Sequence, residues 1–287
     1  MGSSSGSHTL VRGASGYPPS LDGISNPPRR IYIQGTIEQG DILAVAIVGS
    51  RNPTPYGRHM ARTLSGDLAR AGVTIVSGLA RGIDTEAHKA ALLAGGRTLA
   101  VLGCGLDTDY PRHSDQLKTQ IINSGALISE FEAGTPPLPG NFPSRNRIIS
   151  GLSLGVVVVE AGTRSGSLIT ARWALDQGRE VMAVPGRADS PLSRGPITLI
   201  RDGAPPVCEI TDVIQVLGVD LPLPAEIMKF SEDPIMTLLE KGPLLPEEIS
   251  RSTGLPLQKV LSELSRLMIE GVANRDESGA FSRRAGH

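Results

Sequence analysis

Between Leu43 and Gly186 the chain repeats one pattern, in which a short apolar segment without polar alternation is followed by a longer amphipathic segment. β-Branched apolar runs of this kind are typical of strands buried on both faces of a sheet, and helices that return between such strands make them parallel. The predicted strands read AVAIV, VTIVS, TLAVL, ALIS, VVVV and EVMA, and the helical segments between them end at glycines. We therefore predict an α/β fold built on a doubly wound parallel sheet.

In a doubly wound sheet, ligands bind outside the carboxyl ends of the strands. Glycines gather at these predicted strand ends, where they would let backbone N–H groups and helix N-termini approach an anion. The sequence excludes a nucleoside-triphosphate loop, because no Gly-Lys-Ser/Thr follows the first strand, and the Gly-x-Gly-x-x-Gly dinucleotide pattern is missing there too. Alternatively, the glycines only close tight turns. The residues at these ends are Gly49, Ser50, Arg51, Gly78, Arg81, Gly82, Gly103 and Gly105.

Arginines cluster at the same predicted edge, although the net charge of the 287-residue chain is only -1. Arginine binds phosphate oxygens with two hydrogen bonds, and several arginines in a row suit a polyanion better than one small ligand. The ring of Phe142 would stack on one base. The alternatives are that Phe142 packs within its loop and that Arg147 pairs with Glu130 or Glu160. The clustered arginines are Arg51, Arg58, Arg81, Arg145, Arg147 and Arg164.

The sequence shows neither the residue spacing of a metal site nor an apolar run long enough to span a membrane. His59, His88 and His113 are scattered, and Cys104 and Cys208 lack the spacing of a zinc site or a disulfide framework. The sequence predicts no metal site and no cofactor, and a reducing, cytoplasmic location fits best. Apolar runs stay shorter than the ~18 residues that a membrane span needs, so we expect no membrane partner.

Glu160, at the end of the VVVV segment, is the best carboxylate for a functional role. It precedes a hydroxyl-rich helix start that contains Ser167 and that would hold a phosphate or cap the helix. Glu160 itself would cap the turn that follows it or pair with Arg147. Asp84 is expected to cap the predicted helix that follows the VTIVS strand, and His88 lies on a face of that helix.

The composition changes along the chain and indicates several parts. Residues 1–16 are rich in glycine and serine, resemble an expression tag and are excluded from the fold, and residues 17–43 form an N-terminal extension. Residues 44–218 form the sheet domain, and 219–229 a linker rich in proline and leucine. Residues 230–287, with three short helical segments and a terminal hairpin, are predicted to be a small winged-helix domain. Acidic residues outnumber basic ones there, which favours protein interaction over DNA readout.

Several motifs in order identify the family that the sequence resembles. GSR, IVSGLARGIDTEAH, AVLGCGLDTDYP, LISE, FPSRNRIISGLS, VVVVEA, SGSLITARWALDQGREVMAVPG and LIRDGA follow one another between Leu43 and Gln215. This string resembles the DNA-processing protein A (DprA/Smf) family. The resemblance implies an extended Rossmann-like domain without enzymatic activity that binds single-stranded DNA and forms a homodimer. It further implies a role in competence, in which the protein protects incoming strands and loads RecA recombinase during natural transformation and DNA recombination.

The resemblance also implies the residues that contact the strand, in the GSR turn and in an arginine loop. We add Arg81, Arg164 and Ser167 from the charge and hydroxyl patterns. The predicted DNA-binding residues are therefore Gly49, Ser50, Arg51, Arg81, Phe142, Arg145, Asn146, Arg147, Arg164 and Ser167, and no residue is predicted to be catalytic.

Two departures from the family pattern and one alternative function remain. Gly195, Pro196 and Ile197 replace a Gly-Thr/Cys-Asn motif, and only a short segment precedes the sheet domain where the family often carries a small helical domain. The alternative is a nucleoside-monophosphate N-glycosidic hydrolase of a related Rossmann fold, which the segment from Glu160 to Thr163 faintly resembles. Its distinctive Pro-Gly-Gly-x-Gly-Thr motif is absent, and fold alone does not establish function.

Overall fold

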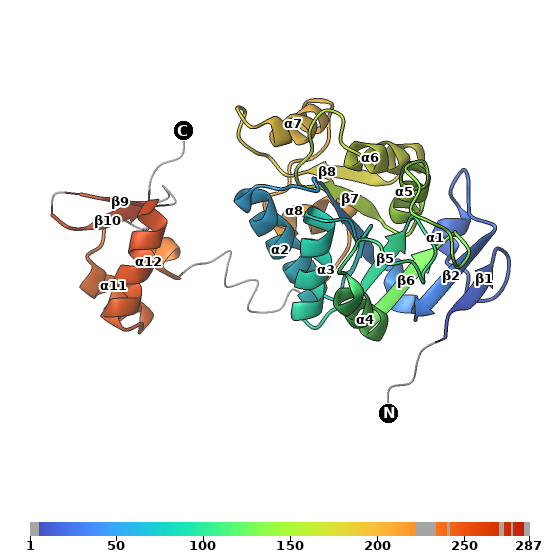
Figure 1. Ribbon diagram of the computed structural model, residues 1–287. Helices are drawn as coiled ribbons and strands as arrows, with labels where there is room; N and C mark the ends of the chain where they lie inside the picture. The colour runs from blue at the N-terminus through green and yellow to red at the C-terminus, as the bar shows by residue number, and fades with distance from the viewer. Residues whose placement is uncertain (1–5, 222–233, 240–241, 270–272, 277, 284–287) are drawn as a thin grey trace. The chain divides into compact units, whose positions relative to one another are not determined.

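The computed structural model describes residues 6–221, 234–239, 242–269, 273–276 and 278–283, and the chain divides after Pro222 into two compact units. The first unit contains an eight-stranded sheet with the strand order β1-β2-β6-β5-β4-β3-β7-β8 (Figure 1). The strands are β1 (His8–Val11), β2 (Arg30–Gly35), β3 (Ala44–Val48), β4 (Thr74–Ser77), β5 (Thr98–Leu102), β6 (Gly125–Ser129), β7 (Gly155–Val158) and β8 (Glu180–Ala183).

The sheet is mixed and mostly parallel. Strands β3 to β8 pair in parallel, as the buried apolar runs predict. At one edge, however, β2 pairs with β6 and β1 pairs with β2 in antiparallel register, so that Leu10 lies opposite Ile31. The expectations of an entirely parallel sheet and of residues 1–16 outside the fold therefore differ from the structure. The alternation typical of an antiparallel edge strand explains the difference, because Ile31 and Ile33 are fully buried while Tyr32 between them is partly exposed.

The helices cover both faces of this sheet (Figure 1). Helices α2 (Pro55–Arg70), α3 (Ile83–Leu93) and α4 (Asp115–Ser124) connect β3 to β6 in sequence and pack on one face. After β6 the chain crosses to β7 on the other side of β3, and α5 (Asn141–Gly151), α6 (Ser167–Asp176) and the short α1 (Pro19–Asp22) cover the opposite face. This reversal at β3 is the switch point at which doubly wound sheets bind ligands.

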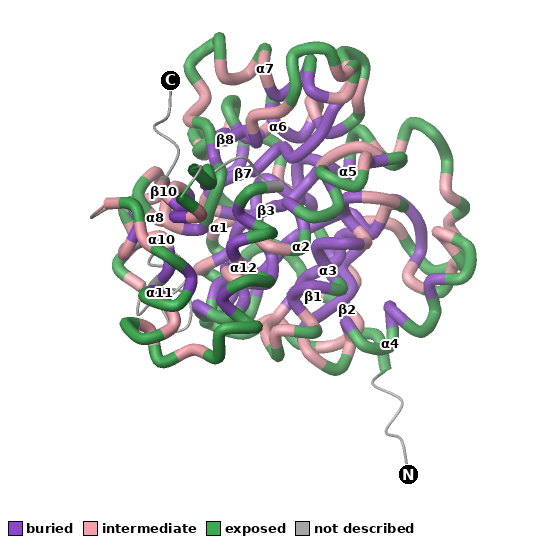
Figure 2. The backbone as a smooth tube through the Cα atoms, turned by 90° about the vertical axis from the view of Figure 1, so that its left-hand side faces the viewer, coloured by how far each residue is buried: buried purple, intermediate pink, exposed green. Residues whose placement is uncertain are grey.

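The main apolar core lies between the sheet and the face that carries α1, α5 and α6. Ile148 and Ile149 of α5 meet Val48 and Val101 of the strands there, and all four side chains are at most 3% exposed. A second cluster, which includes Leu102 and Ile121, lies on the other face. Figure 2 shows β3 and β7 as buried strands inside a rim of exposed segments. The loops at the carboxyl ends of the strands are therefore mounted on a rigid layer.

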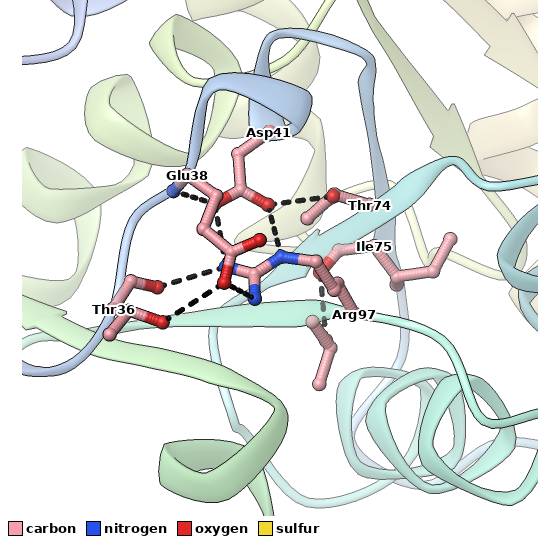
Figure 3. A network of polar contacts seen from close by, with 7 residues as sticks. Thr36, Glu38, Asp41, Thr74, Ile75 and Arg97 are labelled. Carbon is pink, nitrogen blue, oxygen red and sulfur yellow. Dashed lines mark hydrogen bonds and ion pairs between the residues drawn. The ribbon is translucent and has the colours of Figure 1, made fainter.

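A polar network fixes the amino ends of the strands, away from those loops (Figure 3). Arg97, which precedes β5, donates to both carboxylate oxygens of Asp41 at 2.9 and 2.8 Å. Asp41 lies in the short 3-10 helix η1 (Gln39–Ile42) and also accepts a hydrogen bond from Thr74 Oγ1 at 2.8 Å. Arg97 further donates to Glu38 and to the carbonyl of Thr36. The network joins the segment between β2 and β3 to the starts of β4 and β5.

The first unit ends with η2 (Pro191–Ser193), α7 (Arg194–Arg201) and α8 (Ile210–Leu217). Helix α7 packs against β8, and α8 packs against both α2 and β8. Val213 is fully buried, whereas other apolar side chains of the two helices, among them Ile200 and Ile214, stay only half-buried. Helices α7 and α8 thus cover the edge of the sheet at β8 and leave partly exposed apolar side chains beside it.

The second unit contains α10 (Pro234–Leu239), α11 (Pro246–Thr253), α12 (Leu257–Ile269) and an antiparallel pair, β9 (Ala273–Arg275) and β10 (Phe281–Arg283). Ile249, Leu264 and Phe281 are in its small apolar core. The winged-helix assignment stays a prediction, and most of the predicted linker, 219–229, lies outside the described residues. In the described part of the chain, every helix is too short or too polar to cross a bilayer.

Candidate functional site

A cavity of about 620 Å³ opens at the carboxyl ends of β3, β4 and β5, beside the start of α5. We call it the carboxyl-edge pocket. It lies where the predicted sheet topology places a ligand site. The predicted DNA-binding residues that line it are Gly49, Arg51, Phe142, Arg145, Asn146 and Ser167.

Two interlocking loops position Arg51 at this pocket. A Cβ atom on Gly49 would lie 2.7 Å from Ile83 and 2.9 Å from the carbonyl of Glu160, so only glycine fits at the end of β3. Gly82 has a φ of 89°, and a Cβ there would lie 2.3 Å from the carbonyl oxygen of Ser50. That carbonyl accepts a hydrogen bond from the Ile83 N–H at 3.1 Å. The glycines therefore allow close backbone contact between the loops after β3 and β4.

An aromatic pair with a cation over it lines the pocket. The guanidinium of Arg51 lies over the ring of Phe142, and the rings of Phe142 and Tyr110 are 5.2 Å apart between centroids. Sequence reasoning missed Tyr110. Its position, in the loop that follows the predicted strand TLAVL, was the signal that could have identified it. The pocket thus offers flat apolar surface next to a positive charge.

Arg145 lies in helix α5 and not in a loop, which corrects the expectation of an arginine loop. Pro143 is compatible with this helix because it lies in the first turn, where a backbone N–H donor is not required. The side chain of Arg145 is buried and donates to the carbonyl oxygens of Gly78 and Val101 and to Asn146 Oδ1. Burial lowers the pKa of Arg145 to about 10, so the guanidinium stays protonated at neutral pH.

Asp84 differs from its predicted role, whereas His88 lies on the face of α3 as predicted. The carboxylate of Asp84 accepts hydrogen bonds from the backbone N–H groups of Gly78 and Ala80, and does not cap α3. Burial raises the pKa of Asp84, against the opposing effect of the Arg145 charge. His88 is completely buried, and this desolvation lowers its pKa to about 3. It is therefore neutral, and it lies on the face of α3 that contacts Thr98, at 2.7 Å.

Arg147 points away from the carboxyl-edge pocket, on the other side of α5. Its guanidinium donates to Glu130 Oε1 at 2.6 Å, to the carbonyl of Asn26 at 2.8 Å and to the carbonyl of Ser144 at 3.0 Å. The side chain is only 5% exposed. The ion pair with Glu130, one of the two alternatives raised by the sequence, is present. Arg147 therefore joins the segment before β2 to α5.

The remaining predicted cations are exposed. Arg51, Arg81 and Arg164 form no ion pair with any acidic residue in the described ranges. Arg81 directly follows Ala80 and Arg164 directly precedes Ser165, and both of these neighbours line the pocket. Arg58 differs, because it lies 3.6 Å from Glu86. Arg51 thus lines the carboxyl-edge pocket and Arg81 and Arg164 adjoin its lining, and none of the three forms an ion pair among the described residues.

The hydroxyl-rich loop before α6 forms one wall of the pocket. Asn146 donates to the carbonyl of Gly166 at 3.1 Å, which ties this loop to α5. The hydroxyl groups of Ser165 and Ser167 lie 2.8 Å apart. Ser50, by contrast, does not line the pocket, and its hydroxyl accepts the N–H of Asn52 at 3.1 Å. Asn146 thus has a positioning role as well as a place in the pocket lining.

Glu160 orients the start of α2. Its two carboxylate oxygens accept hydrogen bonds from the N–H of Thr54 at 2.9 Å and from the Thr54 hydroxyl at 2.6 Å. It neither pairs with Arg147 nor caps the turn that follows it, which corrects that expectation. A Cβ on Gly57 would lie 2.3 Å from Glu160 Oε2, so the contact requires glycine. Glu160 faces a second, largely apolar cavity, and the described residues hold no group of side chains suited to a metal ion.

Comparison with known proteins gives matches over most of the chain. A family model described as DNA recombination-mediator protein A matches residues 8–218, a range that includes β1. Protein Smf of Escherichia coli (strain K12) is 42% identical over 277 residues, which cover 92% of this chain and 74% of that protein.

Two solved structures are similar to the first unit. The X-ray structure of DNA processing protein A (DprA) from Streptococcus pneumoniae has a TM-score of 0.70 and 41% identity, over 72% of this chain and 73% of that one. A structure of DNA processing protein A from Helicobacter pylori, described as giving insight into its single-stranded DNA binding mode, has a TM-score of 0.65 and 32% identity. That match covers 74% of this chain and 95% of the Helicobacter chain.

Proposed function

We propose that this chain, which belongs to the DNA recombination-mediator protein A family, binds single-stranded DNA along the carboxyl edge of its sheet. The observation that carries the proposal is the set of exposed, unpaired arginines around the carboxyl-edge pocket: Arg51, Arg81 and Arg164. Phosphates neutralise such charges, and a flexible single strand places several of them within reach of one edge. The Helicobacter relative, whose structure concerns single-stranded DNA binding, supports the choice of ligand.

The pocket lining also suits unpaired bases. Phe142 and Tyr110 present aromatic surface beside Arg51, and stacking on such a surface contributes roughly 1 to 3 kcal/mol per base. Duplex DNA keeps its bases inside the helix, so this surface favours a single strand. Gly49, Ser50, Arg81, Asn146, Arg164 and Ser167 stay in the proposed interface as backbone, polar or charged neighbours. Arg145 and Arg147 belong to it through the α5 segment that they anchor.

In the cell, we assign the chain the role of a cytoplasmic mediator that protects incoming strands and loads RecA recombinase onto them during natural transformation. The family description as a recombination mediator supports this role. The proposal includes a homodimer and no enzymatic step. In favour of a non-enzymatic role, both oxygens of Glu160 accept hydrogen bonds from Thr54, which gives this carboxylate a structural part at the start of α2.

A salt titration tests the binding proposal. Fluorescence anisotropy of a labelled oligothymidine should show log K falling with log salt at a slope of roughly -2, since three contacts contribute about 0.7 each on single strands. The same measurement on a duplex of equal length should give weaker binding. A flat salt response, or equal affinity for both forms, would contradict the proposed interface.

The mediator role has a separate test. RecA hydrolyses ATP only after it assembles on DNA, so the lag before hydrolysis on a long single strand should shorten when this protein is added. Variant Arg51→Gln should lose the effect in proportion to its loss of DNA binding. An unchanged lag with intact DNA binding would remove RecA loading from the proposal and leave strand binding in place.

A further inference from the structure

We propose that the groove between α2 and α3 binds an acidic segment of a partner protein, one that also carries a large apolar side chain. This α2–α3 groove has a volume of about 390 Å³ and lies between two helices that pack against each other side by side (Figure 1). It shares no lining residue with the carboxyl-edge pocket. The inference therefore goes beyond strand binding and does not depend on it.

Basic side chains line both sides of the α2–α3 groove. Arg62 and Arg70 come from α2, and Lys89 comes from α3. All three are exposed, and Lys89 forms no hydrogen bond or ion pair with any residue in the described ranges. An exposed ammonium group without a partner is available to a carboxylate of another molecule.

Two acids of the same helices hold the arginines in place. Glu86 is buried, accepts a hydrogen bond from Arg62 Nε at 2.6 Å and lies 3.6 Å from Arg58. Asp67 pairs with Arg70. With the lysine of α3, four cations face two acids, so the groove and its rim carry an excess of two positive charges in a chain whose net charge is -1. A guanidinium has more N–H groups than one carboxylate accepts, so donors remain for a ligand.

The groove also has an apolar part. Leu93, in the last turn of α3, lines it and is 89% exposed, more than any other large apolar side chain in the described part of the chain. Gly66 of α2 lines the groove as well. A Cβ atom on Gly66 would lie 3.5 Å from Arg70 Nη2 and 3.9 Å from the carbonyl oxygen of Ala90, so helix packing does not require glycine there. Glycine is less favourable than alanine inside a helix, and what it contributes at this position is depth to the groove.

These features suit a protein segment better than a nucleic acid. A continuous row of phosphates along the groove would meet the carboxylates of Glu86 and Asp67. The described residues that line the groove include no aromatic side chain on which a base could stack, in contrast to Phe142 in the carboxyl-edge pocket. An apolar side chain of a peptide would remove Leu93 from water, which a phosphate does not. A peptide with both acidic and apolar residues therefore complements the groove.

A selection from random peptides tests the chemistry of the partner. Phage-displayed peptides of about twelve residues are selected on the immobilised full chain and sequenced. We expect the enriched peptides to have an excess of aspartate and glutamate and at least one large apolar residue. The same selection on a chain that carries both Lys89→Glu and Leu93→Asp should not enrich them, because this variant repels carboxylates and lacks the apolar contact.

Fluorescence anisotropy of one enriched, labelled peptide then locates its site. Lys89→Glu and Leu93→Asp should each weaken its binding about tenfold. Arg29→Glu is the matched control and should bind within about twofold of wild type, because Arg29 is also exposed without an ion pair in the described ranges and does not line the groove. All three substituted residues are exposed, so the variants should fold, which circular dichroism checks. Unlabelled oligothymidine should not displace the peptide.

Three outcomes overturn the inference. Enrichment of neutral or basic peptides, or no enrichment, contradicts an acidic partner. Acidic peptides that oligothymidine displaces, and that both groove variants still bind, lie at the carboxyl edge instead. Unchanged peptide binding by Lys89→Glu together with weaker oligothymidine binding assigns the groove to nucleic acid. None of these results refutes strand binding, because the salt titration of oligothymidine on the wild type decides that separately.

Discussion

The guanidinium carbon of Arg51 lies 5.6 Å from the centroid of the Phe142 ring, which joins the turn after β3 to the first turn of α5. The cation is held at the pocket by an aromatic face and not by an acid, so its charge stays available to a phosphate. Two residues far apart in the sequence therefore act as one unit in the proposed interface.

This relationship predicts the effect of Arg51→Gln. Loss of one phosphate contact should reduce the salt slope by about 0.7 and weaken binding of all sequences alike. The measurement is anisotropy over a series of salt concentrations. Arg187→Gln is the control, because Arg187 is exposed but paired with Asp189 at 2.8 Å. An unchanged slope in the Arg51 variant would place the strand elsewhere.

Arg147 should matter for stability more than for DNA affinity. Replacing it by alanine removes its bonds to Asn26, Ser144 and Glu130, and we expect the free energy of unfolding to fall by about 2 kcal/mol. Urea unfolding measures this loss, and anisotropy on the folded variant should show affinity within about twofold of wild type. A large loss of affinity at unchanged stability would instead support the direct strand contact predicted from the sequence.

The Asp41–Arg97 network predicts a dependence of stability on pH. Burial pushes the pKa of Asp41 up, but hydrogen bonds from Arg97, the Glu38 backbone and Thr74 outweigh it and hold this pKa below the ordinary 3.8. Because the folded pKa is depressed, the stabilisation is complete above 3.8 and disappears as the pH falls through the folded pKa.

Asp41→Asn should therefore unfold more easily than wild type at neutral pH, by about 2 kcal/mol. Urea unfolding at several pH values should show this difference shrinking as the pH falls from 3.8 towards the lower pKa of Asp41 in the folded protein. A difference that stays constant down to low pH would mean that the ionised form of Asp41 contributes nothing.

Glu160→Gln separates the two function classes. The glutamine amide can accept only one of the two Thr54 hydrogen bonds, so we expect a loss of about 1 kcal/mol of stability and DNA affinity within a few-fold of wild type. Wild-type protein incubated with nucleoside monophosphates should release no free base by chromatography. Release of base that Glu160→Gln abolishes would establish the hydrolase alternative.

Self-association should depend on the first unit. Ile197, Ile200 and Ile214 stay half-buried on α7 and α8, and a two-fold partner would cover them. A chain cut after Gly218 should therefore remain dimeric by light scattering, and Ile200→Asp should give monomers. Leu93→Asp, on an 89% exposed residue of α3, is the control that should stay dimeric. A monomeric truncated chain would assign dimerisation to the remaining residues.

Local patterns in the sequence identified most of the sheet and the edge that carries the site. The six parallel strands, β3 to β8, coincide with the predicted apolar runs, since burial on both faces favours apolar side chains at most positions. The order of motifs likewise identified the family, which the comparisons confirm. These features depend on neighbouring residues, which a sequence displays directly.

Local sequence patterns did not predict the features that depend on contacts between residues far apart in the chain. The resemblance implies a loop around Arg145 and Arg147, yet the segment is helical and packs Ile148 into the core. The composition of residues 1–16, rich in glycine and serine, predicts an expression tag, and only pairing with β2 gives β1 its place in the sheet.

The sequence by itself determined the fold class, the family and the accumulation of arginines at one edge. Only the tertiary structure decided which arginines are available to a ligand. Arg145 and Arg147 are two residues apart on α5, so they point to different sides of the helix, one to the pocket and one to Glu130. Arg51 is exposed, and among the described residues it has the ring of Phe142 beside it and no ion pair. A guanidinium binds whatever acceptor the fold brings close, and those acceptors come from segments remote in the chain.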